Sequence, residues 1–154
     1  MDVAGELEII ERYMRENGLR WTSQRRLIAQ VALQTHEHFT AEELLELCLQ
    51  RRDGVSRATV YRTLSMLEDA GFVEGLDTGD GSRRFEHVLG HAHHDHMVCT
   101  ECGAIIEFRD DELERRQEAA ASRHDFQITH HSLKLFGLCG NCRSKPRARG
   151  DATA

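Results

Sequence analysis

The chain has 154 residues and a mass of 17.6 kDa, enough for one ordinary domain or two small ones and too few for a large barrel. Hydrophobic residues make up 40% and charged residues 30%, with only one proline, which predicts a folded, helix-rich protein. No apolar run approaches the roughly 20 residues of a membrane span. Asp2, Glu6 and Glu8 lie where a secretory signal would be basic and then apolar. We therefore expect a cytoplasmic protein with no membrane partner.

Charge and histidine content divide the chain. The formal net charge of -6 argues against nucleic acid as a partner unless local basic patches oppose it. Lysine occurs only at Lys134 and Lys145, so positive charge rests on arginine, which suits forked contacts with phosphates and bases. Two histidines precede Glu86 and eight follow it. We predict an N-terminal domain at 1–86, a hinge at 87–92, a metal-rich domain at 93–142 and a frayed tail at 143–154.

The N-terminal half predicts four helices. Apolar residues recur at helical spacing around residues 7–14, 22–33, 40–48 and 57–70. Thr40 and Glu43 have the spacing of a capping box that opens the third helix. Cys48 lies on the apolar face of that helix, and we interpret it as a core residue and not as a metal ligand.

A hairpin is predicted after the fourth helix. Phe72 and Val73 lead to a turn at 77–81, followed by the run 83–85, a pattern typical of a β-hairpin. Helices that end in a hairpin indicate a winged helix-turn-helix, whose last helix enters the major groove. The alternative is a generic helical bundle with a solvated polar face.

The outer face of the fourth helix favours DNA binding over that alternative. Tyr61 and Arg62 lie opposite the core stripe, and this face carries no acidic residue from Arg57 to Leu67. A solvated face would normally mix both signs of charge. We therefore take Arg57, Tyr61 and Arg62 as candidate DNA contacts.

Two cysteine pairs predict a structural zinc site. Each pair can chelate through one turn, and four thiolates satisfy tetrahedral zinc without an open position. Gly103 and Gly140 would let the backbone wrap around the ion. The alternative, two redox-active dithiols, lacks the strand-to-helix context of such motifs. The predicted zinc ligands are Cys99, Cys102, Cys139 and Cys142.

A histidine-rich run at 91–96 precedes the first cysteine pair. In an extended segment His94 and His96 share one face, while His93 and Asp95 share the other. One strand could thus supply two metal sites. The alternative, a solvated polar strand, is weak because histidines are too costly to cluster casually beside the predicted zinc site. Mixed imidazole and carboxylate ligands suit Fe(II), Mn(II), Co(II) and Zn(II), so the metal stays open at this point.

Several motifs together resemble the ferric uptake regulator family of metal-dependent transcription repressors. They occur in the family's order over nearly the whole chain. The motifs are Arg20-Trp21-Thr22 with Gln24-Arg25, Ala58-Thr59-Val60-Tyr61-Arg62, Phe85-Glu86, His93-His94-Asp95-His96, Cys99 to Cys102, Glu107-Phe108, His131-Ser132 and Cys139 to Cys142.

The resemblance implies an α+β fold, with an N-terminal winged helix-turn-helix domain followed by a small α/β dimerisation domain. It also implies two further metal sites. The regulatory ligands would be His38, Glu86, His94, His96 and Glu107, and the accessory ligands His93, Asp95, Glu114 and His131.

Some ligand assignments have competitors. His36 could replace His38, and Glu114 could instead complete a capping box with Asp111. Three other histidines, His87, His124 and His130, match no ligand position, and we expect them at the surface.

The resemblance implies a homodimeric repressor, not an enzyme, that binds palindromic A/T-rich operators in double-stranded DNA when loaded with metal. Arg20 resembles the family residue that enters the minor groove. Peroxide sensors of the family commonly have Asp where this chain has Glu86 and Glu107, and zinc sensors commonly add a cysteine ligand, whereas Cys48 is placed in the core. The resemblance therefore favours Fe2+ as the regulatory metal, in addition to structural Zn2+. Manganese-, zinc- or peroxide-sensing members of the family are alternatives. A zinc hydrolase would need an open coordination position and a general base. A metal buffer protein would not need the acid-free helix face that carries Tyr61.

Overall fold

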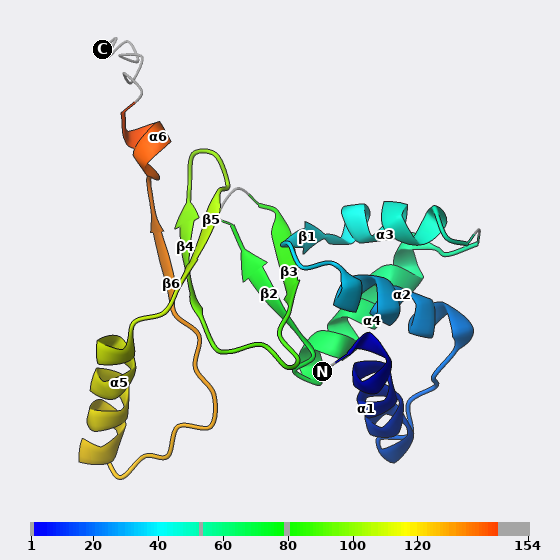
Figure 1. Cartoon of the computed structure of the whole chain (residues 1–154), viewed down its shortest axis with the longest axis horizontal. Coiled ribbons are helices and arrows are strands. Elements are labelled where there is room, and N and C mark those ends of the chain that lie inside the picture. Colours follow the sequence, from blue (N-terminus) through cyan, green and yellow to red (C-terminus); the bar gives the residue numbers. More distant parts are fainter. Residues whose placement is uncertain (1, 53, 79–80, 145–154) are drawn as a thin grey trace, which may run out of the picture. The chain divides into compact units, whose positions relative to one another are not determined.

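The computed structural model describes residues 2–52, 54–78 and 81–144 and divides into two compact units (Figure 1). Unit 1 is Met1–Ala92 and unit 2 is His93–Ala154. The predicted tail at 143–154 lies largely outside the described residues, apart from residues 143 and 144. No helix in the described ranges has both the length and the apolarity to cross a membrane.

Unit 1 begins with four helices around one apolar core. They are α1 (Val3–Glu16), α2 (Ser23–Gln34), α3 (Ala41–Leu49) and α4 (Arg57–Asp69). Asp2, Thr22 and Ser56 cap the starts of α1, α2 and α4 through their side chains. The predicted capping box of Thr40 and Glu43 is present at α3, and Cys48 is fully buried in the core.

A small antiparallel sheet completes unit 1. Its strand order is β1 (Phe39–Thr40), β3 (Arg83–His87) and β2 (Val73–Asp77). The strands β2 and β3 form the predicted hairpin, with Val73 opposite His87 and Asp77 opposite Arg83. Residues 79 and 80 of the predicted turn lie outside the described residues. The short β1 adds an edge strand that the sequence did not indicate, and unit 1 has the order of a winged helix-turn-helix (Figure 1).

Unit 2 consists of a second sheet and two helices. The sheet order is β5 (Ile105–Phe108), β4 (Asp95–Cys99) and β6 (Lys134–Gly137), with β4 antiparallel to β5 and parallel to β6. Helix α5 (Asp111–Arg123) forms part of the crossover from β5 to β6, and α6 (Gly140–Arg143) follows β6 (Figure 1). The mixed helix and strand architecture confirms the predicted α+β class.

The division between the units falls after Ala92. Strand β3 runs to His87, so the segment predicted as a hinge, 87–92, begins inside a strand of unit 1. Its action as a hinge stays a prediction.

Candidate metal centres and DNA-binding face

The four cysteines of the predicted zinc site lie together in unit 2. Cys99 ends β4, Cys102 lies in the following turn, and Cys139 and Cys142 lie at the start and inside of α6. All four Sγ atoms lie within 4.8 Å of one another, and Cys102 and Cys139 are 3.8 Å apart. Gly103 has φ +68°, a left-handed conformation that returns the chain to β5.

The electrostatics of this cluster favour thiolate at Cys99. The backbone N–H of Cys139 donates to Cys99 Sγ at 3.3 Å, and this bond is the main reason that the pKa of Cys99 is lowered to about 6. A hydrogen bond with the Cys102 side chain, followed by burial, raises the pKa of Cys142 to about 12. One gathered set of four sulfurs fits a single tetrahedral zinc better than two separate dithiols.

A second cluster in unit 2 contains the four predicted accessory ligands. The ligand atoms of His93, Asp95, Glu114 and His131 lie within 4.8 Å of one another. His131 Nε2 lies 3.1 Å from Glu114 Oε2, and His93 Nε2 lies 3.4 Å from Asp95 Oδ1. Asp95 is buried and accepts a hydrogen bond from the backbone of Leu133, yet its Oδ2 has no partner among the described residues. A cation would satisfy this carboxylate oxygen.

The alternative role of Glu114 as a helix cap is wrong. Asp110, and not Asp111, caps α5, and its side chain accepts from the backbone of Glu112 and Leu113. The Glu114 carboxylate instead faces His131 and His93, at 3.1 and 3.5 Å. The helix begins one residue earlier than the capping-box spacing assumed, which frees Glu114 to meet the histidines.

The predicted regulatory ligands form one partial set in each unit. In unit 1, His38 Nε2 lies 3.6 Å from Glu86 Oε2. In unit 2, His94 Nε2 lies 3.8 Å from Glu107 Oε2, and the rings of His94 and His96 are 5.0 Å apart. The predicted separation of His94 and His96 from His93 and Asp95 agrees with these contacts. His94 lies just before β4, so the alternation begins in the approach to the strand.

His87 does not lie at the surface as we expected; it is 6% exposed. It pairs across the hairpin at the end of β3 and contacts His91, with ring centroids 4.7 Å apart. His36 joins the same group, so it does not duplicate His38, which lies beside Glu86. The four-residue spacing of His87 and His91 was the one signal in the sequence that could have indicated this group. His124 and His130 are exposed.

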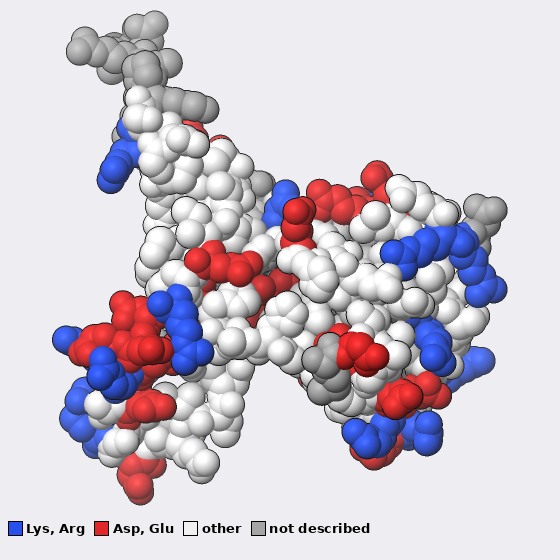
Figure 2. Space-filling model, in the orientation of Figure 1, with Lys and Arg blue, Asp and Glu red and all other residues white. Residues whose placement is uncertain are grey.

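The outer face of α4 presents the predicted DNA contacts. Arg57, Tyr61 and Arg62 are exposed, whereas Val60, Leu64 and Leu67 of the opposite stripe are buried. Arg20 is also exposed. Figure 2 shows Lys and Arg side chains in local groups over the helices of unit 1, with acidic groups beside them. The net acidity of the chain therefore does not exclude a local basic surface.

One acidic side chain from another helix reaches this face. The Tyr61 hydroxyl donates a hydrogen bond of 2.8 Å to Glu42 Oε1 on α3, and Arg57 Nη1 lies 3.4 Å from the same oxygen. The bond lowers the pKa of Glu42 and raises the pKa of Tyr61. The sequence could not reveal this neighbour, because the acid-free pattern was read along α4 alone.

A winged-helix unit joined to a unit with cysteine, histidine and carboxylate clusters defines the class of metal-responsive DNA-binding regulators. The model of the "Ferric uptake regulator family" matches residues 16–136, and the chain belongs to this family.

The chain is similar to known members over most of its length. It is 38% identical to the ferric uptake regulation protein of Campylobacter jejuni, over 90% of this chain and 89% of that protein. It is 35% identical to the peroxide-responsive repressor PerR of Staphylococcus saprophyticus, over 93% of this chain and 100% of the other. The solved structure of the Helicobacter pylori regulator Fur, described as having three functional metal binding sites, matches with a TM-score of 0.80. That match has 32% identity and covers 94% of this chain and 96% of the other.

Proposed function

We propose that this protein is an iron-responsive repressor, and not an enzyme, which binds palindromic A/T-rich operators in the cytoplasm as a metal-loaded homodimer. The observation that carries this proposal is the division of the regulatory ligands. Unit 1 supplies His38 and Glu86, 3.6 Å apart, and unit 2 supplies His94, His96 and Glu107. Two ligands from unit 1 or three from unit 2 would coordinate a transition metal incompletely. We therefore propose that the two sets bind one ion together.

Regulation follows from this division of ligands. An ion held by both sets cross-links the two units. His38 and Glu86 then fix the DNA-binding unit, while His94, His96 and Glu107 fix the dimerisation unit. A two-fold dimer must present its recognition helices to half-sites about one DNA turn apart. Metal thus acts as an effector through its greater affinity for the DNA-competent arrangement.

The exposed face of α4 supports operator recognition. We propose that Arg57 contacts phosphate, that the Tyr61 ring packs against thymine methyl groups, and that Arg62 contacts guanine or phosphate. Arg20, exposed before α2, would enter an A/T-rich minor groove, whose narrow width concentrates negative potential.

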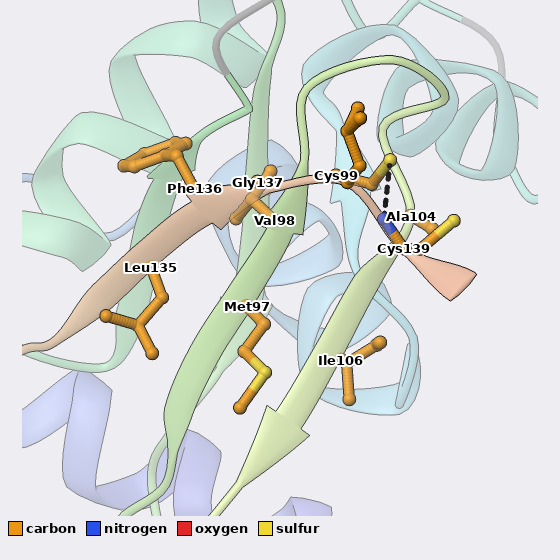
Figure 3. A pocket seen from close by; sticks show the side chains of 10 residues that line it. Met97, Val98, Cys99, Ala104, Ile106, Leu135, Phe136, Gly137 and Cys139 are labelled. Carbon is orange, nitrogen blue, oxygen red and sulfur yellow. Dashed lines mark hydrogen bonds between the residues drawn. The ribbon is translucent and has the colours of Figure 1, made fainter. Parts of the chain in front are cut away.

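An uncovered apolar face on unit 2 supports dimerisation. Met97 lies opposite Ile106 on β5 and opposite Leu135 on β6, so the three side chains form one row across the sheet (Figure 3). All three are between 40% and 50% exposed, and Leu138, just after the end of β6, is also exposed. Phe136 is exposed too, on the other side of β6 (Figure 3). A hollow of about 160 Å³ lies among these side chains (Figure 3). Contiguous exposed apolar surface of this kind marks an interaction site, and we propose a second copy of this chain as its occupant.

The other two clusters of unit 2 would bind metal ions that stabilise the fold. We propose that Cys99, Cys102, Cys139 and Cys142 hold zinc, which ties the end of β4 to α6. The accessory ligands would join β4 and α5 to the segment before β6, since Asp95, Glu114 and His131 come from these three places. The unpartnered Oδ2 of the buried Asp95 supports a cation at this second site.

Iron is favoured as the regulatory metal. The candidate ligands are imidazoles and carboxylates, a donor set that suits Fe(II) and Mn(II). Cys48, the one cysteine outside the four-sulfur cluster, is fully buried in unit 1 and so does not supply the added thiolate of zinc-sensing relatives.

Anaerobic measurement of operator affinity tests this proposal. Affinity should rise with Fe(II), and protection of the operator should extend over two half-sites. Loss of operator binding after treatment with peroxide would favour the peroxide-sensing alternative. The 35% identity to a PerR protein is the reason for including this test. Metal-independent binding would contradict the proposed regulation.

A further inference from the structure

A third histidine cluster lies wholly inside unit 1. The ligand nitrogens of His36, His87 and His91 lie within 4.8 Å of one another. His36 precedes β1, His87 ends β3, and His91 follows four residues later. Glu6 of α1 reaches the same place, with Oε2 3.4 Å from His87 Nε2. None of these residues belongs to the clusters assigned above.

The buried members of the cluster lack hydrogen-bond partners. His87 is 6% exposed and Glu6 is 4% exposed. Among the described residues, the two ring nitrogens of His87 and the Oε2 atom of Glu6 have no hydrogen-bond partner. Burial of a polar atom without a hydrogen-bond partner is unfavourable, because the atom loses its hydrogen bonds to water. A purely structural role for His87 leaves this cost unexplained.

An ion pair between His87 and Glu6 does not remove the problem. His87 Nε2 lies 3.4 Å from Glu6 Oε2, yet neither atom completes a hydrogen bond among the described residues. A divalent cation would bind the imidazole nitrogen and the carboxylate oxygen together, since both are ligand atoms for such ions.

The backbone brings His91 back toward the cluster. Gly90 has φ +77°, and the His91 N–H donates to the Val88 carbonyl at 3.1 Å, which closes a turn. A Cβ at Gly90 would lie 3.4 Å from Glu6 Oε1, so the turn packs closely on the carboxylate. The ring of His91 then lies 4.7 Å from that of His87 and 6.3 Å from that of His36.

We propose that Glu6, His36, His87 and His91 form a divalent transition-metal site inside the DNA-binding unit. Three imidazoles and one carboxylate satisfy a four-coordinate ion of the zinc class. Such an ion joins α1, the segment before β1 and the segment after β3. The site stabilises unit 1 and is separate from the proposed regulatory site.

Zinc binding by the full-length protein tests this site. The double variant His36→Ala/His91→Ala removes two exposed ligands without opening the core. After equilibrium dialysis against Zn2+, wild type should contain one more zinc per chain than this variant. The matched control, His124→Ala/His130→Ala, removes two exposed histidines outside every cluster and should keep the wild-type content.

The single tryptophan gives a second readout within unit 1. Trp21 lies just before α2, so its fluorescence reports unfolding of this unit. Zn2+ should raise the unfolding temperature of wild type and of the control more than that of His36→Ala/His91→Ala, because a ligand that binds the folded state stabilises it. Glu6→Gln keeps the packing and should weaken zinc affinity about tenfold or more, as even outer-shell changes do.

Equal zinc content in wild type and in both double variants would overturn the proposal. Unchanged zinc content together with lost metal-dependent DNA binding in His36→Ala/His91→Ala would also overturn it, because these histidines would then serve regulation. Loss of one zinc with DNA response retained supports it.

Discussion

The Tyr61 hydroxyl on α4 donates a 2.8 Å hydrogen bond to Glu42 Oε1 on α3. The same oxygen lies 3.4 Å from Arg57. An acid from outside α4 thus partly neutralises the face that we propose for DNA. Since DNA phosphates are negative, this carboxylate opposes binding unless it accepts a hydrogen bond from a base.

Removing this acid should strengthen DNA binding. Glu42→Gln keeps the side-chain shape and releases Arg57, so operator affinity should rise about fivefold, equivalent to about 1 kcal/mol. The slope of log affinity against log salt should steepen by about 1 as a phosphate contact is gained. Glu46→Gln, on an exposed position of the same helix, is the control and should change little. Weaker binding by Glu42→Gln would mean that this carboxylate reads a base.

Loss of the aromatic or guanidinium group should weaken operator binding. Tyr61→Ala or Arg62→Ala should cost about 1–3 kcal/mol in gel-shift titrations, because each removes a proposed base contact. Dimerisation and metal content should stay unchanged, since both side chains are exposed on α4. Arg12→Ala, exposed on α1, serves as a charge-matched control. Normal titrations for both variants would contradict the assignment of α4.

Cysteine variants should distinguish the proposed zinc ligands from the core residue Cys48. Cys99→Ser or Cys139→Ser should lose zinc and destabilise unit 2, since a structural zinc contributes about 10 kcal/mol or more of binding free energy. Cys48→Ala should keep zinc and destabilise unit 1 instead, because Cys48 is buried in that core. Elemental analysis and thermal melts measure both effects. Full zinc retention in the Cys99 variant would refute the four-thiolate site.

The two faces of the histidine run should respond differently to mutation. His96→Ala should weaken DNA binding even at saturating Fe(II) or Mn(II), because it removes a proposed regulatory ligand. Asp95→Ala should lose one bound metal and keep most of the metal response, because Asp95 contacts His93 in the accessory cluster. Operator affinity against metal concentration measures both variants. The reverse pattern would exchange the two sites.

Metal-free protein should lose stability in mild acid through His87. Its pKa falls from 6.5 to about 4 on folding, so between these values the unfolded chain binds a proton that the folded chain does not. The free energy of unfolding should therefore decrease as pH falls through this window, by up to about 3 kcal/mol. Glu6 acts in the opposite direction, because burial raises the pKa of its carboxyl.

Urea titrations of chelator-treated protein, followed by Trp21 fluorescence, measure this dependence. His87→Gln cannot take up the proton and should show a flatter profile between pH 6.5 and pH 4. His124→Gln, exposed in unit 2, should keep the wild-type profile. Identical slopes for wild type and His87→Gln would show that His87 is not protonated on unfolding.

The sequence by itself determined the features that depend on local spacing. Caps, apolar periodicity and the hairpin pattern predicted the helices of unit 1 and the strands β2 and β3, because each forms from neighbouring residues. The two cysteine pairs predicted a single metal cluster, since each pair can chelate through one turn and four thiolates satisfy tetrahedral zinc.

Only the tertiary structure decided which distant side chains meet. Glu114 was ambiguous until the cap of α5 proved to be Asp110, which left its carboxylate facing His131. His87 looked like a surface residue, yet pairing of β3 buries it and brings it to His36, about fifty positions earlier in the chain. Such contacts arise from strand pairing and helix packing between remote segments, and no spacing pattern within one segment encodes them.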